Sequence, residues 1–148
     1  MQPLPHQYAA RLTAAATGDA ELTSDGVPPL ALNAPVDFDG PGTAWSPEQL
    51  LLAAVEGCFL LTFRSVASLS KLPFVSLVAE ARGTVDRNEG RVRFTAITVT
   101  AALTVPAGTD IERARRLAEK AEGACLISAS LATPVHLEVR VNEAPAGA

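Results

Sequence analysis

The sequence predicts an α+β fold whose elements follow one another in the order βββ-α-ββ-α-β. Three observations support this order. Residues 46–70 form a long apolar run with helix signals at its start, whereas residues 75–85 and 92–105 are strand-like segments separated by a tight turn. Residues 109–125 then place apolar side chains at helical spacing, and residues 135–142 alternate apolar and polar side chains as a half-buried strand does.

Length, composition and charge narrow the class of protein. The chain has 148 residues, 48% of them hydrophobic, which is typical of one globular domain spanning 1–148, with a tail, about 143–148, that is expected to fray. Up to Phe63 a single base, Arg11, stands against seven acids, so Lys and Arg do not cluster as a nucleic-acid groove requires. We expect no nucleic-acid partner. The N-terminal residues lack the charged and apolar regions of a signal peptide, so a cytoplasmic location is expected.

The residues before the long helix are expected to form three short strands and a loop. The expected strands are 8–15, 20–24 and 30–32. Turn signals at Gly18 and at Asp25-Gly26 separate them. Residues 33–44 include the run Gly40-Pro41-Gly42, which predicts a loop leading into the helix. Because this loop has no Gly-Lys-Ser or Gly-Lys-Thr ending, a plain connection is favoured over an anion site.

The long helix has clear start and stop signals. Ser46 and Gln49 form a capping box at its beginning, and Pro47 suits the first helical position. The helix is expected to end near Lys71, because Pro73 disfavours the α conformation in the residue before it.

A helix that is apolar on nearly every side must be enclosed by protein or by lipid. Glu56 and then Arg64 interrupt the run of about 20 uncharged residues that a membrane span needs, so we expect no membrane association. One sheet covers only one face of such a helix. A second copy of the chain is the simplest cover, which predicts a homodimer whose core holds the long helices of both subunits.

Two further signals lie in the second half of the chain. The hairpin turns at Arg87–Gly90, and its second strand changes apolar phase between Phe94 and Ile97, the pattern of a β-bulge. Thr109 and Glu112 form a second capping box, which predicts an amphipathic helix with one face toward the core.

Two cysteines are the candidates for chemistry. Cys58 lies in the middle of the long helix and Cys125 is expected at the C-terminal end of the second helix, so both should be buried. Each taken singly is typical of an inert core residue, whereas the pair in a reducing compartment also fits redox-active thiols. Neither position is expected at a helix N-terminus, so a cationic partner would have to stabilise a thiolate. His6 and His136 do not form ligand spacing with either cysteine, and no metal is expected.

Two glutamates flank the first cysteine. Glu48 precedes Cys58 by ten residues, about 15 Å along a straight helix, so only the other subunit could bring it to the thiol. The alternative is that Glu48 simply stabilises the helix dipole. Glu56 lies in an apolar stretch, and we expect it either at a rim or, preferably, paired with a base, because an unpaired buried charge costs several kcal/mol.

Short motifs give the sequence a family resemblance. They are Ser46-Pro47-Glu48-Gln49-Leu50, Gly57-Cys58-Phe59, and Ala124-Cys125-Leu126-Ile127-Ser128 with Ser130. Together with the order of elements, they are similar to the OsmC and organic hydroperoxide resistance (Ohr) family over most of the chain. The resemblance implies an OsmC-like fold, with two sheets around two long central helices in an intertwined homodimer and sites at the subunit interface.

The resemblance also implies roles for individual residues. In peroxidase members the cysteine matching Cys58 attacks an organic hydroperoxide and becomes a sulfenic acid, and the cysteine matching Cys125 condenses with it as a disulfide. The glutamate matching Glu48 is an orienting acid. A small dithiol such as dihydrolipoamide reduces the disulfide, and no metal or haem cofactor takes part.

One departure from the family pattern leaves two hypotheses. Peroxidase members carry an arginine in the turn after the first strand, but here residues 16–19 contain no base, and Arg11 and Arg64 are the candidate substitutes. The first hypothesis is a thiol-dependent peroxidase of organic hydroperoxides, favoured by both cysteines and Glu48. The alternative, favoured by the absent arginine, is a non-catalytic OsmC-like protein that binds a small ligand or senses oxidants through a slow Cys58–Cys125 disulfide.

Overall fold

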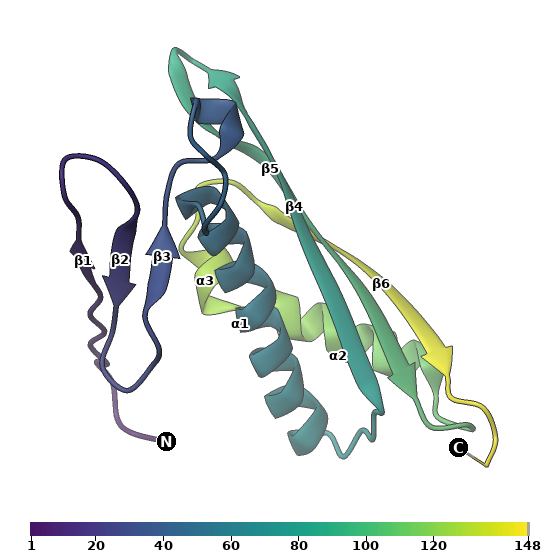
Figure 1. Cartoon of the computed structure of the whole chain (residues 1–148). Coiled ribbons are helices and arrows are strands. Elements are labelled where there is room, and N and C mark those ends of the chain that lie inside the picture. Colours follow the sequence, from purple (N-terminus) through teal and green to yellow (C-terminus); the bar gives the residue numbers. More distant parts are fainter. Residues whose placement is uncertain (148) are drawn as a thin grey trace. The chain divides into compact units, whose positions relative to one another are not determined.

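The computed structural model describes residues 1–147 (Figure 1). The chain forms two compact units, Met1–Leu51 and Leu52–Ala148, and the long helix α1 (Pro47–Leu69) begins in the first and continues in the second. The α+β class and the predicted order of strands and long helices are confirmed. A single domain over 1–148 with a frayed end stays a prediction, and the last residue lies outside the described part of the chain.

The N-terminal unit contains a three-stranded antiparallel sheet in the order β1-β2-β3. Its strands are β1 (Arg11–Thr13), β2 (Ala20–Thr23) and β3 (Leu30–Leu32). The first strand is shorter than predicted, since alanine residues flank it and alanine is a poor strand former. The turn before β2 uses Gly18 at a φ of 90°, and the turn before β3 uses Gly26 at 78°, which glycine adopts without strain.

The loop after β3 is more ordered than the sequence predicts. It contains a short 3₁₀ helix, η1 (Val36–Phe38). Gly40 packs directly against the start of this loop, where a Cβ atom would lie 2.0 Å from the Ala34 carbonyl oxygen. Only glycine permits this approach of two backbone segments, so Gly40 fixes the loop that leads into α1.

Helix α1 begins as predicted. The Ser46 backbone N–H donates to Gln49 Oε1 (3.0 Å) and the Gln49 N–H donates to Ser46 Oγ (3.2 Å), which is a capping box. The helix ends at Leu69, two residues earlier than Lys71, which takes a positive φ of 51°. Both ends are therefore determined by local chemistry.

Only one stripe of α1 is buried. It consists of side chains four residues apart: Val55, Phe59, Phe63 and Ala67. By length and composition alone α1 could cross a membrane, with a mean hydropathy of 1.7 over its most apolar window, but core helices have the same character. The stripe packs in the core of the second unit, whereas Leu61 and Leu69 elsewhere on the helix are 61% and 86% exposed. A large apolar surface of α1 is thus uncovered in a single chain.

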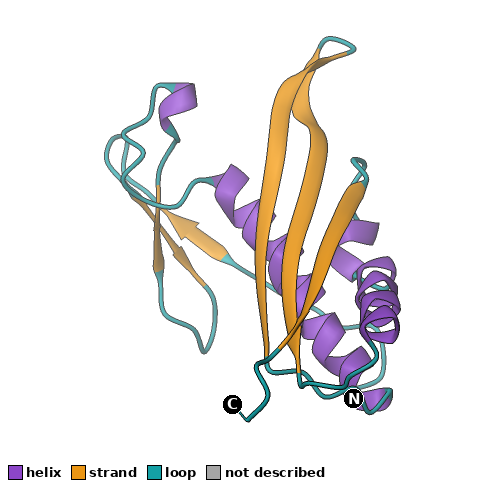
Figure 2. Cartoon of the chain, turned by 90° about the vertical axis from the view of Figure 1, so that its right-hand side faces the viewer, coloured by secondary structure: helices purple, strands orange, loops and turns teal. Residues whose placement is uncertain are grey.

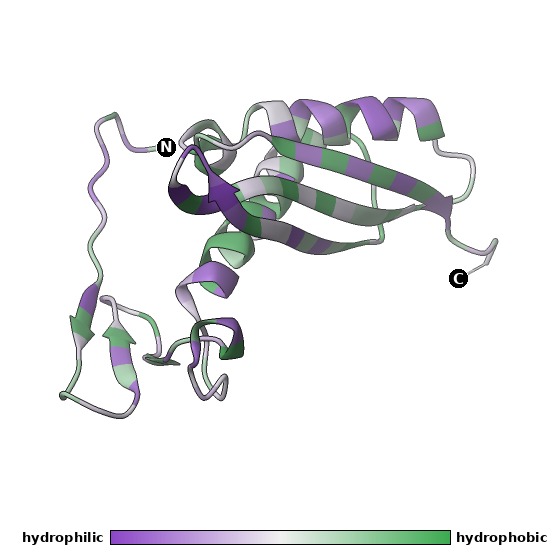
Figure 3. Ribbon diagram, turned by 90° about the horizontal axis from the view of Figure 1, so that it is seen from above, coloured by the Kyte–Doolittle hydropathy of each residue, from purple (hydrophilic) through white to green (hydrophobic). Residues whose placement is uncertain are grey.

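The second unit is a three-stranded sheet with helices packed on it (Figure 2). Its strands are β4 (Ser76–Asn88), β5 (Arg91–Val105) and β6 (Val135–Glu143). β4 and β5 are antiparallel, whereas β6 runs parallel to β5. Hydrophobic and hydrophilic residues alternate along the strands (Figure 3), and alternate residues of β5 from Ile97 to Val105 are buried in the core with α1 and α2.

The predicted bulge and hairpin turn are both present. Thr84 pairs with Ala96 and Val85 pairs with Phe94, so Thr95 is the extra residue of β5. The turn residues Glu89 and Gly90 both have positive φ, at 50° and 78°, as a two-residue turn that matches strand twist requires.

Helix α2 (Ile111–Gly123) has its N-cap one residue later than predicted. The cap is Asp110, whose carboxylate accepts the Arg113 N–H at 2.9 Å, so the predicted Thr109 capping box is wrong. The Thr109 hydroxyl donates to the Pro106 carbonyl instead (2.7 Å). A charged acceptor at the adjacent position competes successfully with the threonine.

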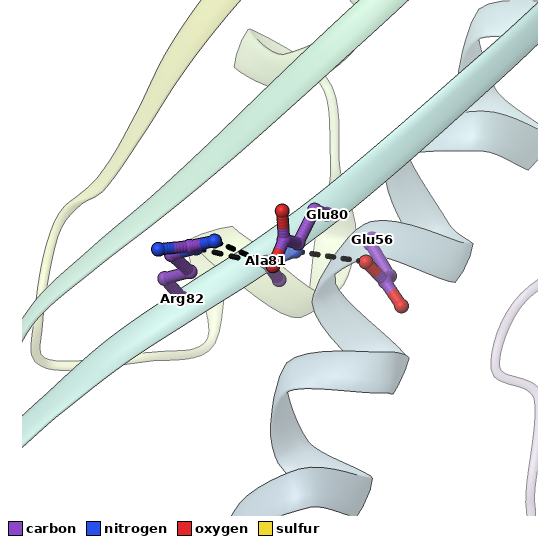
Figure 4. A network of polar contacts seen from close by, with 4 residues as sticks. All are labelled: Glu56, Glu80, Ala81 and Arg82. Atoms are coloured by element: carbon purple, nitrogen blue, oxygen red, sulfur yellow. Dashed lines mark hydrogen bonds and ion pairs between the residues drawn. The ribbon is translucent and has the colours of Figure 1, made fainter.

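Glu56 has a different partner from the base we expected. Its carboxylate accepts the backbone N–H of Ala81 on β4 at 2.9 Å (Figure 4). The nearby Glu80–Arg82 ion pair (3.0 Å) does not involve Glu56 and is largely exposed. A backbone amide therefore satisfies one oxygen of Glu56, and the bond fastens α1 to the outer edge of the sheet.

Candidate functional site

The second unit brings the two cysteines together. Cys58 is half-buried in α1, and its sulfur lies 4.0 Å from the hydroxyl of Thr62, one turn later in the same helix. Cys125 is only 1% exposed. The two thiols are free and lie beside each other, close enough for the Cys125 thiol to donate a hydrogen bond to Cys58.

The sequence predicted Cys125 at the C-terminal end of α2, and this prediction is wrong. Helix α2 stops at Gly123, and Cys125 takes an extended conformation (φ −69°, ψ 114°) as the N-cap of a short helix, α3 (Leu126–Ala129). Its sulfur accepts the Ser128 N–H at 3.5 Å, the role that a Ser or Asp side chain usually has. The expectation that neither cysteine lies at a helix N-terminus is therefore wrong for Cys125.

The start of α3 supplies donors to Cys58. Burial by itself would raise the pKa of the Cys58 thiol. Hydrogen bonds from the Cys125 thiol, from the backbone N–H groups of Ile127 and Leu126 and from the Thr62 hydroxyl have the opposite effect, and the net result is a lowered pKa. Neutral donors at a helix start can thus favour a thiolate without a cation.

Cys125 has the opposite tendency. Burial raises the pKa of its thiol, and the neighbouring Cys58 raises it further, whereas interactions with Ser128 partly offset this. The pair is therefore asymmetric, because the Cys58 thiol ionises more readily than the Cys125 thiol. Such asymmetry separates a nucleophile from a second thiol that acts later.

No guanidinium hydrogen-bonds to Cys58 within residues 1–147. Arg64 is exposed on α1, and Arg11 is exposed on β1 of the N-terminal unit. The turn that lacks a base has Asp19 as its charged residue, and this carboxylate accepts a hydrogen bond from Asn33 at 2.9 Å. A role of Arg11 or Arg64 as substitute for the family arginine stays a prediction.

Glu48 belongs to a cavity of the N-terminal unit. The cavity has a volume of about 360 Å³ and is lined by residues that include Phe38, Asn33 and Glu48. Glu48 Oε2 and Asn33 Oδ1 are both buried and have no hydrogen-bond partner among the described residues. Unpartnered buried acceptors are uncommon, which marks this cavity as a place where a donor is missing.

Sequence reasoning missed three polar residues beside the thiols: Thr62, Ser128 and Glu122. Thr62 and Ser128 follow their cysteines by four and three residues, spacings that bring side chains together in a helical turn. Glu122 Oε2 is buried without a partner, and burial raises the pKa of this carboxyl while Ser128 partly offsets the change. Because α2 ends at Gly123 and Cys125 is extended, no sequence spacing marked Glu122.

The described residues 1–147 contain no group of three or more His, Cys, Asp or Glu side chains arranged to hold a metal ion. That the protein uses no metal or other cofactor stays a prediction. The chemistry of the site is that of two thiols, a carboxyl group and neutral N–H and O–H donors.

Comparisons with known proteins agree with this fold. An uncharacterised protein of Bacillus subtilis, YmaD, is 26% identical over 115 residues, which cover 76% of this chain and 77% of that protein. The structure of an OsmC-like protein of unknown function from Vibrio cholerae matches with a TM-score of 0.83 at 19% identity, covering 92% of this chain and all (100%) of that one. An organic hydroperoxide resistance protein from Elizabethkingia anophelis matches with a TM-score of 0.76 at 22% identity, covering 97% and 100%.

The sequence model of one family also matches. It is described as OsmC-like protein and covers residues 40–140, which include both cysteines and all of α1, β4, β5 and α2. This range is more than two thirds of the chain. The chain therefore belongs to the OsmC-like protein family.

Proposed function

We propose that this protein is a thiol-dependent peroxidase that reduces organic hydroperoxides. The observation that carries the proposal is the asymmetric thiol pair at the start of α3, with the pKa of Cys58 lowered and that of Cys125 raised. A structural relative named as an organic hydroperoxide resistance protein also supports this proposal. Glu48 is the proposed orienting acid.

The proposed reaction has two steps in the protein. The Cys58 thiolate attacks the terminal oxygen of ROOH, the O–O bond breaks, and RO⁻ takes up a proton and leaves as ROH. The Cys125 thiol then forms an S–S bond to the Cys58 sulfenic acid, the S–O bond breaks, and water leaves. A small external dithiol, of the lipoyl type, is oxidised as it reduces this disulfide.

Apolar surface beside the thiols supports an organic substrate. Leu126, directly after Cys125, is 68% exposed, and Leu61, three residues after Cys58, is 61% exposed. A hydrocarbon group of a hydroperoxide would gain about 25 cal/mol for each Å² of apolar surface that it buries here. Hydrogen peroxide has no such group, so the proposed preference is for organic peroxides.

The assembly is part of the proposal. The uncovered apolar surface of α1 supports a homodimer in which the long helices of two copies pack together. The unpartnered Glu48 supports a role for the partner subunit's Glu48 at the thiols, where it would orient a donor or the substrate. A cytoplasmic location, where thiols stay reduced, fits this chemistry.

Stopped-flow consumption of cumene hydroperoxide by the reduced protein, without added thiol, tests the proposal. We expect rapid loss of one peroxide per subunit, abolished by Cys58→Ser. Cys125→Ser should retain this first turnover but form no intramolecular disulfide. Loss of peroxide no faster than in Cys58→Ser would exclude the peroxidase.

No guanidinium acts on the Cys58 thiol within residues 1–147, which favours a second candidate, a small-ligand binder or slow redox sensor. In that case the disulfide would form over minutes or longer and peroxide would not be turned over. A second stopped-flow measurement with an added dithiol separates the two, because only a peroxidase consumes further equivalents of peroxide within the time of the first turnover.

A further inference from the structure

The hydroxyl group of Thr62 has an unusual partner for a threonine inside a helix. Ser and Thr side chains within helices commonly bond to the backbone carbonyl four residues earlier. Ser65 of α1 does this, donating to the Leu61 carbonyl oxygen at 3.3 Å. Within residues 1–147, the one partner recorded for the Thr62 hydroxyl is instead the Cys58 sulfur, at 4.0 Å. This hydroxyl is therefore directed to the thiol and not to the helix backbone.

Helix geometry explains the contact. Side chains four residues apart lie on the same face of a helix, and the Cα–Cβ bonds tilt toward the helix N-terminus. The Thr62 side chain therefore leans over the turn that carries Cys58. Both residues are half-buried in the middle of α1, several turns from either end. The helix itself thus holds the hydroxyl beside the thiol.

The contact by itself allows either group to be the donor. A neutral S–H is a weak donor, so a bond from the thiol to the threonine oxygen stabilises the thiol only slightly. A bond from the O–H group to a thiolate has an ionised acceptor, and such bonds are about twice as strong as those between neutral groups. The hydroxyl therefore stabilises the thiolate more than the thiol. In agreement, burial raises the pKa of the Cys58 thiol, whereas bonds from Cys125 and Thr62 are among those that lower it.

Few charged groups compete with this donor. Cys125, at the start of α3, is the titratable group that acts on Cys58. The nearest charged residues along α1 are Glu56, which bonds to the Ala81 N–H of β4, and Arg64, which is exposed. Within residues 1–147 no charged side chain of another element forms an ion pair or a hydrogen bond with the Cys58 sulfur. A neutral hydroxyl is thus a main side-chain donor at this sulfur.

We propose that Thr62 is a catalytic residue of the first step, because its hydroxyl donates to the Cys58 thiolate and maintains it until a hydroperoxide arrives. The threonine keeps its proton throughout. The electron pair of the sulfur forms the S–O bond, the O–O bond breaks, and RO⁻ takes up a proton from solvent. The inference rests on the proposed function and adds a side chain to its first step.

A donor to a thiolate has two opposite effects on its reactivity. It increases the fraction of the cysteine that is ionised in acid, and it lowers the nucleophilicity of each thiolate, because nucleophilicity falls as the pKa falls. Removing the hydroxyl should therefore slow the reaction of Cys58 in acid but leave it equal or faster in alkali. A side chain that only packs against Cys58 would not produce this dependence on pH.

Alkylation of Cys58 by iodoacetamide over a range of pH tests the proposal. The reduced full-length protein is used, and mass spectrometry counts the modified Cys58 peptide separately from that of Cys125. Thr62→Val keeps the branched shape but has no hydroxyl. In this variant we expect the midpoint of the rate profile to rise by about 0.5–1 pH unit, equal to about three- to tenfold less thiolate in acid. The rate in alkali should equal or exceed that of wild type.

Three further variants separate the hydroxyl from other features of the helix. Thr62→Ser keeps the hydroxyl and should keep the wild-type midpoint. Ser65→Ala removes a hydroxyl that bonds to a backbone carbonyl of the same helix, so its midpoint should also be unchanged. Thr62→Ala introduces a strong helix former and should have the same raised midpoint as Thr62→Val, which keeps the test available if the valine variant does not fold.

Two results would overturn the proposal. An unchanged or lowered midpoint in Thr62→Val and Thr62→Ala would show that the hydroxyl does not donate to the thiolate, and a lowered one would show that it accepts from the thiol. A rate that falls equally at every pH would show that Thr62 acts only on the packing of Cys58.

Alkylation also separates this inference from the peroxidase, because iodoacetamide reacts with an accessible thiolate whether or not peroxide is reduced. In stopped flow, Thr62→Val should consume cumene hydroperoxide more slowly than wild type at a pH below the wild-type midpoint. Raised midpoints in a protein that ignores cumene hydroperoxide would contradict the peroxidase alone. Unchanged midpoints in a protein that consumes it would contradict the role of Thr62 alone.

Discussion

The two units of this chain differ in how far each is complete. Every fully buried hydrophobic side chain among the described residues lies in the second unit, between Val55 and Val141, whereas Met1–Leu51 buries only Ser46. The second unit also supplies the donors around the Cys58 thiol. Each unit leaves two buried polar side-chain atoms without a hydrogen-bond partner among the described residues, so this feature does not separate them. A three-stranded sheet without a buried face is marginal in water, so the N-terminal unit needs a cover. The homodimer proposed above would provide it.

The largest expected effect tests the core of the second unit. Phe63 is fully buried and contacts Phe59 and Phe74, with ring centroids 6.3 and 5.2 Å apart. Phe63→Ala should lower the free energy of unfolding by about 3–5 kcal/mol, because it removes contacts and leaves a cavity. Chemical denaturation measured by circular dichroism checks this value.

Leu22→Ala is the matched change in the N-terminal unit. Leu22 is half-buried on β2, so in a lone chain its loss should cost under about 1 kcal/mol. A loss of stability close to that of Phe63→Ala would contradict the statement that the N-terminal sheet has no buried face. It would instead show that this sheet is covered in solution. Sedimentation of both variants then tells whether the cover is a second copy.

The second effect contrasts two glycines. A Cβ atom at Gly40 would lie 2.0 Å from a backbone oxygen of Ala34, whereas one at Gly57, next to Cys58, would meet nothing within 4 Å. Gly40→Ala should therefore destabilise the first unit by about 2 kcal/mol or more, the range of other forced backbone and packing conflicts. Gly57→Ala should stabilise α1 by up to about 1 kcal/mol in a lone chain.

Thermal unfolding of both variants measures the two effects. A Gly57→Ala protein that is less stable than wild type would mean that a second copy packs closely on this part of α1. An unchanged melting temperature for Gly40→Ala would show that the loop adjusts at no cost, against the close approach described here.

These elements also show what the sequence can predict. The ends of α1 were predictable because Ser46, Gln49 and Pro73 affect the backbone only a few residues away. The bulge in β5 was predictable because the apolar residues change from one face of the strand to the other between Phe94 and Ile97. Helix α3 was not, because its four residues are too few to show periodicity.

The candidate site was predictable only in part. Cys58 and Cys125 could be identified as a pair from the motifs around them, and the structure brings them together. The cap role of Cys125 depends on the interruption between α2, which ends at Gly123, and α3, which begins at Leu126. Such an interruption leaves no periodic pattern in the sequence, so the structure was needed to find it.

The third prediction adds a cation to the turn of the N-terminal unit that lacks one, residues 16–19. Asp19 occupies the turn where peroxidase members carry an arginine, and it lies in the unit that holds the unpartnered Glu48. Asp19→Arg should give Glu48 a guanidinium partner and increase the rate of peroxide consumption by about tenfold, equal to about 1.4 kcal/mol of transition-state stabilisation. Stopped-flow traces measure the rate.

Asp19→Ala is the control, since it removes the Asn33 contact without adding a charge. Equal rates for the two variants would mean that a guanidinium in this turn does not act on the thiols. The difference between the units would then concern stability alone.

The smallest expected effect concerns stability against pH at Glu122. Burial raises the pKa of this carboxyl group in the folded protein above its ordinary value of 4.5. The folded state therefore binds more protons than the unfolded state between these two values, and its stability falls as pH rises through them. Above the raised pKa the whole penalty is present, whereas below 4.5 both states are protonated and it vanishes. Glu122→Gln removes the ionisation, so it should be more stable than wild type at neutral pH and lose this advantage in acid.

The size of the advantage follows from partial exposure. Because solvent still reaches part of Glu122 and screens its charge, the gain at neutral pH should be a few tenths of a kcal/mol and at most about 1 kcal/mol. Urea denaturation at neutral pH and at a pH below the ordinary value, with Glu119→Gln as the exposed control, measures it. A Glu122→Gln protein that is less stable at neutral pH would mean that the ionised carboxylate has a favourable partner.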